Sequence, residues 1–394
     1  MHILFILSRY YPAIGGGELA TRALVNELAK TNKITVITQR TDNDTNWLYG
    51  TTINAPSEEL RIRDINSDII MISPSRISRI AMYPWVKLYD RVRFLSVPAL
   101  AKIILPYLRI SEKPEIIHNV YIGREYLSLA SHSLSKEYGV PFVFTPIAHT
   151  HKVYWNSYYM NYLYENANGL VAMTEYEKEW LLKKGAKGEI IVNGVAPVGI
   201  GEEVKTFDFK SKFTNGKDYI LFIGQKNPYK GYKLLVNVFK VLKDEFPELC
   251  LVLMGAGFGE KFFGENTDER IIYRGNVTDE EKKSAFASCI AFCLPSTEES
   301  FGGVFLEAWS FKKPVIGCPL KEISSWIENE KEALLVSPET DKWTAALKRL
   351  LKDEDLQKRL GEAGYVKLKS KYSWEIISER TLKFYERLKV KKNA

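Results

Sequence analysis

Short apolar runs alternate with longer amphipathic stretches along almost the whole chain of 394 residues. Apolar runs of about four to eight residues are typical of buried strands, and apolar residues spaced three and four apart are typical of helices. Such alternation predicts α/β architecture with parallel sheets. We expect strands at 2–7, 34–38, 116–118, 141–145, 169–174 and 189–192, and then at 219–224, 249–254, 271–273, 290–294, 314–317 and 333–337, with helices such as 18–30, 234–246 and 342–351 between them.

The length of the chain favours two domains, because 394 residues and 45.2 kDa are too much for one ordinary core. The two sets of runs are separated near residues 197–216, where Gly and charged residues are frequent and periodicity is weak. We therefore expect one doubly wound domain at 1–197 and another at 217–373. A last helix should follow at about 374–388.

The composition is that of a soluble globular protein, with 45% hydrophobic and 26% charged residues. The longest apolar stretch, 94–108, is broken by Pro98, Lys102 and Pro106, so we expect no membrane-spanning helix. The first residues lack a signal-peptide pattern, and we expect a cytoplasmic protein. The four cysteines lie in apolar runs without the spacing of zinc ligands, which predicts buried thiols and no metal site.

The most informative motif is a pair of carboxylates, Glu299 and Glu307, with a Gly pair between them. It follows an apolar run that ends in Pro295, so the pattern predicts a strand, a loop and a helix start. Backbone N–H groups at a helix start attract anions and polar sugar faces. We expect Glu299 in the loop and Glu307 about one turn inside the helix, facing different parts of one ligand.

This segment resembles the E-x7-E motif of retaining GT-B glycosyltransferases of family 4. The resemblance extends over about residues 1–388 and implies two Rossmann-like domains that face a central cleft, with the last helix crossing back to the first domain. It implies that Glu299 contacts the transferred sugar and that Glu307 holds the ribose of the nucleotide. It also assigns to the donor site the residues Phe301, Gly302, Gly303 and Val304.

Two further glycine-rich loops resemble family segments. Residues 12–18, of pattern P-x-x-G-G-x-E, imply that Gly16 and Gly17 approach the donor diphosphate and the acceptor; the spacing is not that of a dinucleotide fingerprint, and a flexible turn is the alternative. Residues 224–231 match G-R-x4-K-G, which implies that Lys230 grips the diphosphate. Gln225 stands where the family has Arg, so one positive charge is missing.

Two histidines follow predicted strands at the edge where α/β proteins bind ligands. His149 matches a family histidine that faces the donor sugar, and we expect a catalytic role for it together with Glu299. His118 resembles a second family stretch and is a weaker candidate for acceptor contact. A lone histidine is usually structural, which is the alternative for His118.

Residues 76–109 match no family motif, but they carry seven basic side chains and one acid with aromatic residues between them. This composition suits anionic lipid headgroups. Trp85, Arg91 and Arg93 are our candidates for contact with a membrane or an acceptor, and an ordinary solvated helix face is the alternative. No nucleic-acid motif accompanies the segment, so we expect no nucleic-acid partner.

The resemblance implies a metal-independent hexosyltransferase with no cofactor. Its co-substrate would be a UDP- or GDP-linked sugar, and its acceptor a glycan or a lipid-linked glycan. A non-catalytic protein of the same fold that binds nucleotide sugars or lipids is the alternative.

Overall fold

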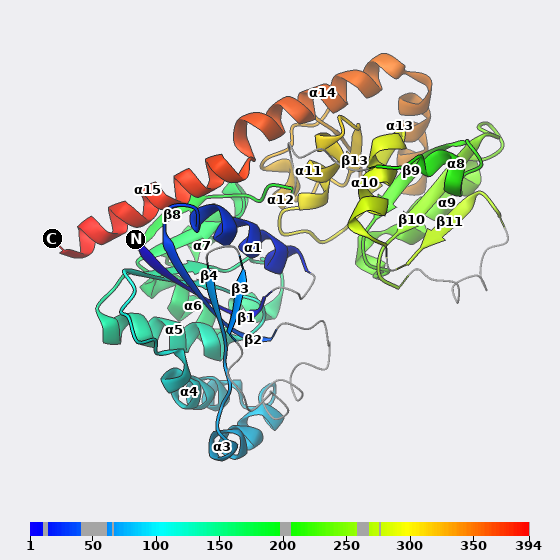
Figure 1. Cartoon of the computed structure of the whole chain (residues 1–394). Helices are drawn as coiled ribbons and strands as arrows, with labels where there is room; N and C mark the ends of the chain where they lie inside the picture. Colours follow the sequence, from blue (N-terminus) through cyan, green and yellow to red (C-terminus); the bar gives the residue numbers. More distant parts are fainter. Residues whose placement is uncertain are drawn as a thin grey trace. The chain divides into compact units, whose positions relative to one another are not determined.

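The computed structural model describes residues 1–10, 15–40, 61–64, 67–197, 206–257, 268–275 and 277–393. The chain separates into two compact units (Figure 1). Unit 1 contains Met1–Val195 and Trp374–Ala394, and unit 2 contains Ala196–Ser373. Part of the predicted linker, residues 198–205, lies outside the described residues.

Unit 1 is built on an eight-stranded sheet of order β3-β4-β2-β1-β5-β6-β7-β8. All of its neighbouring strands run parallel except β3 and β4. From β1 the strand order grows outward in both directions, so β1 and β5 meet where it reverses. The strands are β1 (His2–Arg9), β2 (Lys33–Arg40), β3 (Arg61–Asp64), β4 (Ser67–Met71), β5 (Ile116–Val120), β6 (Phe142–Thr145), β7 (Gly169–Ala172) and β8 (Glu189–Val192).

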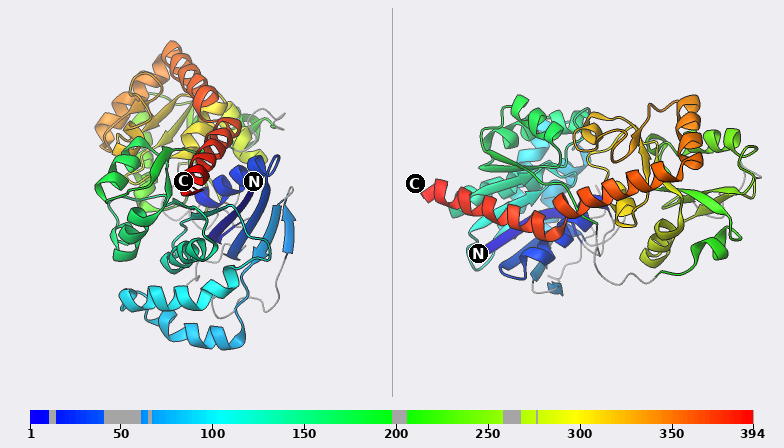
Figure 2. Two further views of the ribbon diagram at one scale, coloured as in Figure 1. Left: turned by 90° about the vertical axis from the view of Figure 1, so that its left-hand side faces the viewer. Right: turned by 90° about the horizontal axis from the view of Figure 1, so that it is seen from above.

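Helices cover both faces of this sheet (Figure 2). One core lies between the sheet and the group α3 to α7, and the other lies between the sheet and α1 with α15. The helices are α1 (Gly16–Leu28), α3 (Arg76–Lys87), α4 (Arg93–Ile104), α5 (Glu125–Tyr138), α6 (Tyr158–Asn166), α7 (Glu175–Lys183) and α15 (Trp374–Asn393), with 3-10 turns η1 (Leu105–Leu108) and η2 (Val153–Asn156).

The last helix, α15, returns to unit 1, as the resemblance implies. Asn193, at the end of β8, donates to the Ile377 carbonyl at 3.2 Å and to the Thr381 hydroxyl at 2.7 Å. Gly169 of β7 lies under Phe384, and a Cβ added there would come within 2.4 Å of the Phe384 ring. The helix is therefore an integral part of the first core.

Unit 2 has a six-stranded parallel sheet of order β11-β10-β9-β12-β13-β14. Its order reverses between β9 and β12. The strands are β9 (Asp218–Ile223), β10 (Leu249–Met254), β11 (Ile271–Arg274), β12 (Ala291–Leu294), β13 (Val315–Gly317) and β14 (Leu334–Leu335). The helices are α8 (Phe209–Phe213), α9 (Tyr232–Leu242), α10 (Asp279–Ser288), α11 (Gly303–Ser310), α12 (Lys321–Ser324), α13 (Thr340–Lys352) and α14 (Glu354–Lys371), with the 3-10 turn η3 (Pro228–Lys230).

The helix pattern of the sequence explains this packing. In α9 the buried positions Leu235, Val238, Phe239 and Leu242 recur at spacings of three and four, and this face packs against α13. In unit 1 the Thr174 side chain accepts from the Glu177 N–H and caps α7, as its position predicts.

The predicted α/β class is confirmed, but the first sheet is not wholly parallel. The strand pair β3–β4 was missing from the sequence prediction, and it is antiparallel. Only residues 65 and 66 separate the two strands, too few for the crossover that parallel strands require. Both strands are also short, which weakens their sequence signal.

His118 on β5 lies in the core of unit 1, with 1% of its surface exposed. One ring nitrogen lies 2.5 Å from the Tyr385 hydroxyl and the other 2.6 Å from the Thr145 hydroxyl. Burial lowers the pKa of His118 to about 3 from the ordinary 6.5. The prediction that His118 contacts an acceptor is therefore wrong for this structure, because both nitrogens serve the junction of β5, β6 and α15.

We predict that the neutral His118 makes unit 1 sensitive to acid. Below pH 6.5 the unfolded histidine binds a proton, whereas the folded one stays neutral until about pH 3. Stability should thus fall as pH drops below 6.5, by about 1.4 kcal/mol per pH unit. Urea unfolding at pH 7 and pH 5 measures this, and His118→Gln should lose less between the two values than the wild type. Equal losses in both proteins would contradict the assignment.

Candidate functional site

Each unit places polar side chains at the point where its strand order reverses. In open α/β sheets the loops after the two central strands run to opposite faces there and leave a crevice at the carboxyl edge. In unit 1 these loops follow β1 and β5, and in unit 2 they follow β9 and β12. The predicted site residues other than His118 and the three on 85–93 lie in or beside such loops.

Unit 1 has a hollow of about 330 Å³ at this position. It is lined by the ends of β1 and β2, by the start of α1, and by the loops after β5 and β6. Its lining consists of Ser8, Arg9, Gly17, Glu18, Gln39, Tyr121, Ile122, Gly123, Arg124, Ile147, His149 and Trp155. Guanidinium, carboxylate, amide, imidazole and aromatic groups thus converge in one hollow, as is typical of a site for a polar ligand.

An ion pair at the start of α1 shapes one wall of this hollow. Arg9 binds the carboxylate of Glu18, which is 3% exposed. A Cβ on Gly15 would lie 2.3 Å from that carboxylate, so a larger residue there would require the Glu18 side chain to shift. Gly17 is less constrained: its Cβ would lie 3.1 Å from the Ile147 side chain, which is a tight contact. Gly16 has open space beside it, and Pro12 of the same motif lies outside the described residues.

His149 reaches the hollow from a loop with a strained backbone. Ile147 has a φ of 47°, a left-handed conformation that is unusual for a β-branched residue. The His149 ring lies edge-on to Trp155, with 5.1 Å between ring centroids. Both rings line the hollow.

Glu177 holds this loop in place, and sequence reasoning missed that role. Its carboxylate accepts from the Ala148 N–H at 2.7 Å and from the Met173 N–H at 2.6 Å, although it is only 1% exposed. Glu177 thereby joins the loops after β6 and β7. The only sequence signal was the Thr174-x-x-Glu177 spacing of a helix start.

In unit 2 an ion pair spans the reversal of strand order. The Lys230 ammonium donates to the Glu299 carboxylate at 2.6 Å, and the two side chains are 20% and 10% exposed. Lys230 ends η3, after β9, and Glu299 lies in the loop after β12. The two strands are neighbours in the sheet. Two residues 69 positions apart in sequence therefore meet at the carboxyl edge.

Backbone contacts fix these two loops against each other. The Thr297 N–H donates to the Tyr229 carbonyl at 2.8 Å. Gly231 has a φ of 77°, and a Cβ there would lie 2.0 Å from the Pro295 carbonyl oxygen. Glycine is thus required for both backbone conformation and space, and the position of Lys230 is set by the backbone before any ligand binds.

The helix α11 begins directly after Glu299. Gly302 has a φ of 77° and caps the helix, and Gly303 and Val304 are its first residues, both partly exposed. N–H groups at such a position have no carbonyl partner within the helix and favour anions. The Phe301 ring is 3% exposed and stacks on Trp326, with 4.5 Å between ring centroids. Its predicted contact with the donor is therefore corrected to a packing role.

Glu307 lies one turn inside α11, as expected, and its partner was not predicted. Its carboxylate lies 3.1 Å from the ammonium of Lys282 on α10. Glu307 is 29% exposed and Lys282 is 26% exposed, so both remain accessible to a ligand. Glu299 and Glu307 thus form separate ion pairs, the first with Lys230 and the second with Lys282.

Gln225 follows β9 and is exposed. The Lys226 N–H donates to the Ala256 carbonyl at 2.9 Å, which joins this loop to the one after β10. Gln225 thus occupies an accessible position but brings no charge to it.

Trp85 lies on α3, Arg91 lies in the turn between α3 and α4, and Arg93 is the first residue of α4. Trp85 is half-buried against the first core, and Arg91 is exposed. Arg93 is turned inward, where its Nε donates to Glu125 at 2.6 Å, and Glu125 is fully buried. Arg93 is therefore a structural ion pair, which corrects its predicted contact with a membrane or acceptor.

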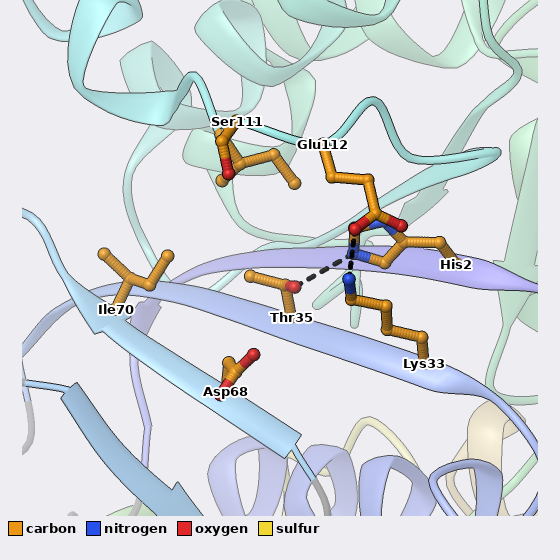
Figure 3. Close-up of a pocket in the computed structure, with 8 residues that line it drawn as sticks. His2, Lys33, Thr35, Asp68, Ile70, Ser111 and Glu112 are labelled. Atoms are coloured by element: carbon orange, nitrogen blue, oxygen red, sulfur yellow. Dashed lines mark hydrogen bonds and ion pairs between the residues drawn. The ribbon is translucent and has the colours of Figure 1, made fainter.

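A second hollow, of about 100 Å³, lies at the opposite, amino edge of the first sheet (Figure 3). In this hollow the imidazole ring of His2 lies 3.0 Å from the Thr35 hydroxyl, and Glu112 forms an ion pair with Lys33. Burial lowers the pKa of His2, with a smaller contribution from Lys33. The hollow is small and lies away from the ends of strands where α/β sheets bind ligands, so it is not our candidate site.

Within the described residues, no group of three His, Cys, Asp or Glu side chains is arranged to hold a metal ion. No helix in that part of the chain has the length and apolar character needed to cross a bilayer. The four cysteines are buried, as predicted, and burial raises the pKa of Cys289 and Cys318 to about 12.

Two family models match the chain. Glycosyltransferase Family 4 matches residues 14–197, and Glycosyl transferases group 1 matches residues 203–367. Relatives include the phosphatidyl-myo-inositol mannosyltransferase of Mycobacterium tuberculosis, 24% identical over 57% of this chain and 61% of the relative. The D-inositol 3-phosphate glycosyltransferase of Paenarthrobacter aurescens is 27% identical over 56% and 58%. The matched region thus spans about six tenths of these relatives' length.

Solved structures share the whole fold. Sucrose-phosphate synthase from Thermosynechococcus elongatus superposes with a TM-score of 0.74 at 17% identity, covering 98% of this chain and 99% of that one. HepE of Anabaena in complex with UDP-glucose superposes with a TM-score of 0.70 at 14% identity, covering 98% and 100%. At such identities the likeness establishes the GT-B fold.

We predict that Glu177→Gln loosens the His149 loop. One of two buried N–H groups would face an amide NH₂ and lose its acceptor, at a cost of about 1.5–3 kcal/mol. Hydrogen exchange at the Ala148 amide should become faster, and the unfolding midpoint should fall. Glu175→Gln on the same helix is the matched control, because Glu175 is 59% exposed and pairs only at the surface with Lys178. Equal effects of the two substitutions would rule out the anchoring role.

Proposed function

The chain belongs to the family 4 glycosyltransferases, and from this premise we propose that it transfers a hexose from a nucleoside-diphosphate sugar to an acceptor hydroxyl with retention of configuration. The observation that carries the proposal is the Lys230–Glu299 ion pair, which spans the reversal of strand order in unit 2. It puts an ammonium group and a carboxylate side by side at the place where α/β sheets bind nucleotides. A donor offers a diphosphate to the first and sugar hydroxyls to the second.

In the proposed reaction the bond between the sugar C1 and the diphosphate oxygen breaks, and a bond from C1 to the acceptor oxygen forms. The acceptor proton passes to the departing diphosphate. Negative charge grows on that diphosphate, so positive groups and N–H donors held in advance at this point lower the barrier. Lys230 and the first N–H groups of α11, at Gly303 and Val304, are suited to this role. Gln225 adds a hydrogen-bond donor without charge.

The ion pair implies a change of partner when the donor binds. Lys230 is partly buried with Glu299 as its counter-charge. Diphosphate oxygens would share or take over the ammonium, and Glu299 would then be released to accept hydrogen bonds from sugar hydroxyls. Because charged hydrogen bonds are replaced by charged hydrogen bonds, the exchange leaves no buried charge unpaired.

We assign the ribose to Glu307. A carboxylate accepts hydrogen bonds from two neighbouring hydroxyls, and Glu307 is accessible at the side of α11. Lys282 keeps that carboxylate in place without a ligand. Gly302, whose backbone requires glycine, sets the direction of the helix that presents both Glu307 and the N–H groups.

We assign the acceptor to the hollow of unit 1. His149 would face the reacting sugar, and Gly16 and Gly17 would allow a phosphate or sugar close to the backbone of α1. The Arg9–Glu18 pair offers both donors and an acceptor for hydroxyl groups. Glycans and lipid-linked glycans fit such a lining. The relatives' names, which include a phosphatidylinositol and an inositol phosphate as acceptors, support a polar acceptor of this kind.

A panel of UDP- and GDP-hexoses tests the function. We expect release of free nucleoside diphosphate from one of these donors and a faster release when a suitable glycan or lipid-linked acceptor is added, with no metal or cofactor supplied. Binding of a nucleotide sugar without any turnover, with or without acceptors, would instead identify a non-catalytic binding protein.

A matched pair of variants locates the nucleotide in the same assay. Glu307→Ala should raise the donor KM by about fivefold to 150-fold, because a ribose contact worth about 1–3 kcal/mol is lost. Glu280→Ala, an exposed acid on α10, should leave the donor KM unchanged. An unchanged KM in Glu307→Ala would remove that residue from the donor site.

A further inference from the structure

Helix α3 is the outermost element at one end of unit 1. It packs on α4, which packs on α5, so among the residues that the structure describes only one side of α3 faces the protein (Figures 1 and 2). Met82 and Val86 on that side are buried. In a globular protein the opposite side of such a helix is expected to be polar.

The outer side of α3 is apolar instead. Ile77 is 80% exposed and Ile80 is 66% exposed, and Pro84 and Leu88 follow at helical spacing, also exposed. We call these four residues the α3 stripe. A helix with one apolar side in the core and a second apolar side in water predicts that something covers the second side.

The start of α4 also carries exposed apolar side chains. Phe94 is 65% exposed and Leu95 is 55% exposed. The Phe94 ring contacts Tyr158, which is 65% exposed, with 5.8 Å between centroids. The α3 stripe together with Phe94, Leu95 and Tyr158 is called the α3–α4 face below.

Basic side chains surround this face. Residues 76–109 contain seven Lys and Arg and only one acid, Asp90. Arg93 and Arg109 are bound in ion pairs with Glu125 and Glu137. Arg76, Lys87 and Arg91 are exposed. Apolar side chains flanked by exposed cations match the boundary between lipid headgroups and acyl chains.

We propose that the α3–α4 face docks on an anionic lipid bilayer, with Ile77, Ile80 and Phe94 inserted and Arg76, Lys87 and Arg91 against the headgroups. A second copy of the chain fits less well, because two such basic faces repel each other. An apolar protein groove leaves the cations without counter-charges. The observations therefore favour a lipid surface over a protein partner.

The docked face lies next to the hollow of unit 1. Arg93 stands between the two: its neighbour Phe94 belongs to the face, while its partner Glu125 follows Arg124, which lines the hollow. The Arg93 guanidinium also lies 4.6 Å from the ring of Tyr154, the neighbour of Trp155 in the hollow wall. An acceptor held in the bilayer would thus meet the hollow beside the docked face. This last step rests on the proposed function, whereas the docking itself does not.

Co-sedimentation of the full chain with vesicles tests the docking without any need for activity. The wild type should sediment with vesicles of phosphatidylcholine and phosphatidylglycerol at low salt, and with pure phosphatidylcholine vesicles far less. Binding should fall steeply as ionic strength rises, since each surface cation is screened. A wild type that ignores anionic vesicles at low salt, or binds both kinds equally, would overturn the proposal.

Two matched pairs of variants separate the apolar and the charged contributions. Ile77→Asn/Ile80→Asn should weaken binding at least tenfold, whereas Val241→Asn/Val366→Asn, which removes two valines that are 55% and 63% exposed in unit 2, should not change it. Arg76→Gln/Lys87→Gln/Arg91→Gln should weaken binding and flatten its salt dependence. Lys233→Gln/Lys240→Gln/Lys358→Gln loses the same charge from unit 2 and should change neither by more than about twofold.

Equal losses in the test and control variants would contradict the assignment of the face. Sedimentation velocity without lipid tests whether a second copy of the chain covers the α3–α4 face. If the wild type forms a dimer that Ile77→Asn/Ile80→Asn abolishes, a second copy covers the face and the proposal is overturned. Circular dichroism and release of nucleoside diphosphate from the donor should be the same in Ile77→Asn/Ile80→Asn as in the wild type. If the vesicles bind but no donor reacts, the docking stands and the proposed function fails.

Discussion

The Lys230–Glu299 ion pair is the interaction on which the site of unit 2 depends. The strand order of unit 2 reverses between the neighbouring strands β9 and β12. The loops that follow these two strands therefore run to opposite faces of the sheet and leave a crevice between them. Placing an ammonium and a carboxylate there, both largely out of water, is stable only because each serves as the other's partner. The hydrogen bond from the Thr297 N–H to the Tyr229 carbonyl joins the two loops, and Gly231 allows their close approach at Pro295. A ligand that satisfies both charges can therefore enter without rearranging the loops.

Unit 1 also holds charged groups at its reversal of strand order. Its own reversal of strand order, between β1 and β5, also carries an ion pair, Arg9 with Glu18, with Gly15 lying against it. Glu177 and the strained Ile147 then set the position of the His149 loop. In both units the proposed ligand-binding groups are held by buried charges, and in unit 2 also by a glycine backbone, before any substrate arrives, which is the preorganisation that electrostatic catalysis requires.

Much of the fold and part of the site followed from the sequence. Period and composition predicted the strands of both sheets, because buried parallel strands are continuous apolar runs; the short β3–β4 hairpin had too little of that signal. Lys230, Glu299 and His149 were placed correctly at strand ends, although their roles remain proposals. Which way a side chain points was not predictable: Phe301, His118 and Arg93 all turned inward. Their partners Trp326, Tyr385 and Glu125 lie far away in sequence, and only the fold brings them together. For the same reason the sequence did not predict that Lys282 pairs with Glu307, or that one apolar side of α3 faces outward.

The most direct test of the central claim is calorimetric titration of the preferred nucleoside diphosphate into two variants of the ion pair. Lys230→Met should bind it about tenfold or more weakly than the wild type, because a charge-assisted contact with phosphate is lost. Glu299→Gln should bind it as tightly as the wild type or up to about tenfold more tightly, because Lys230 is then released from a competing carboxylate while the nucleotide has no sugar for Glu299 to hold. Opposite responses of the two variants are the result that the account predicts. Equal weakening by both, or no change in either, would contradict it.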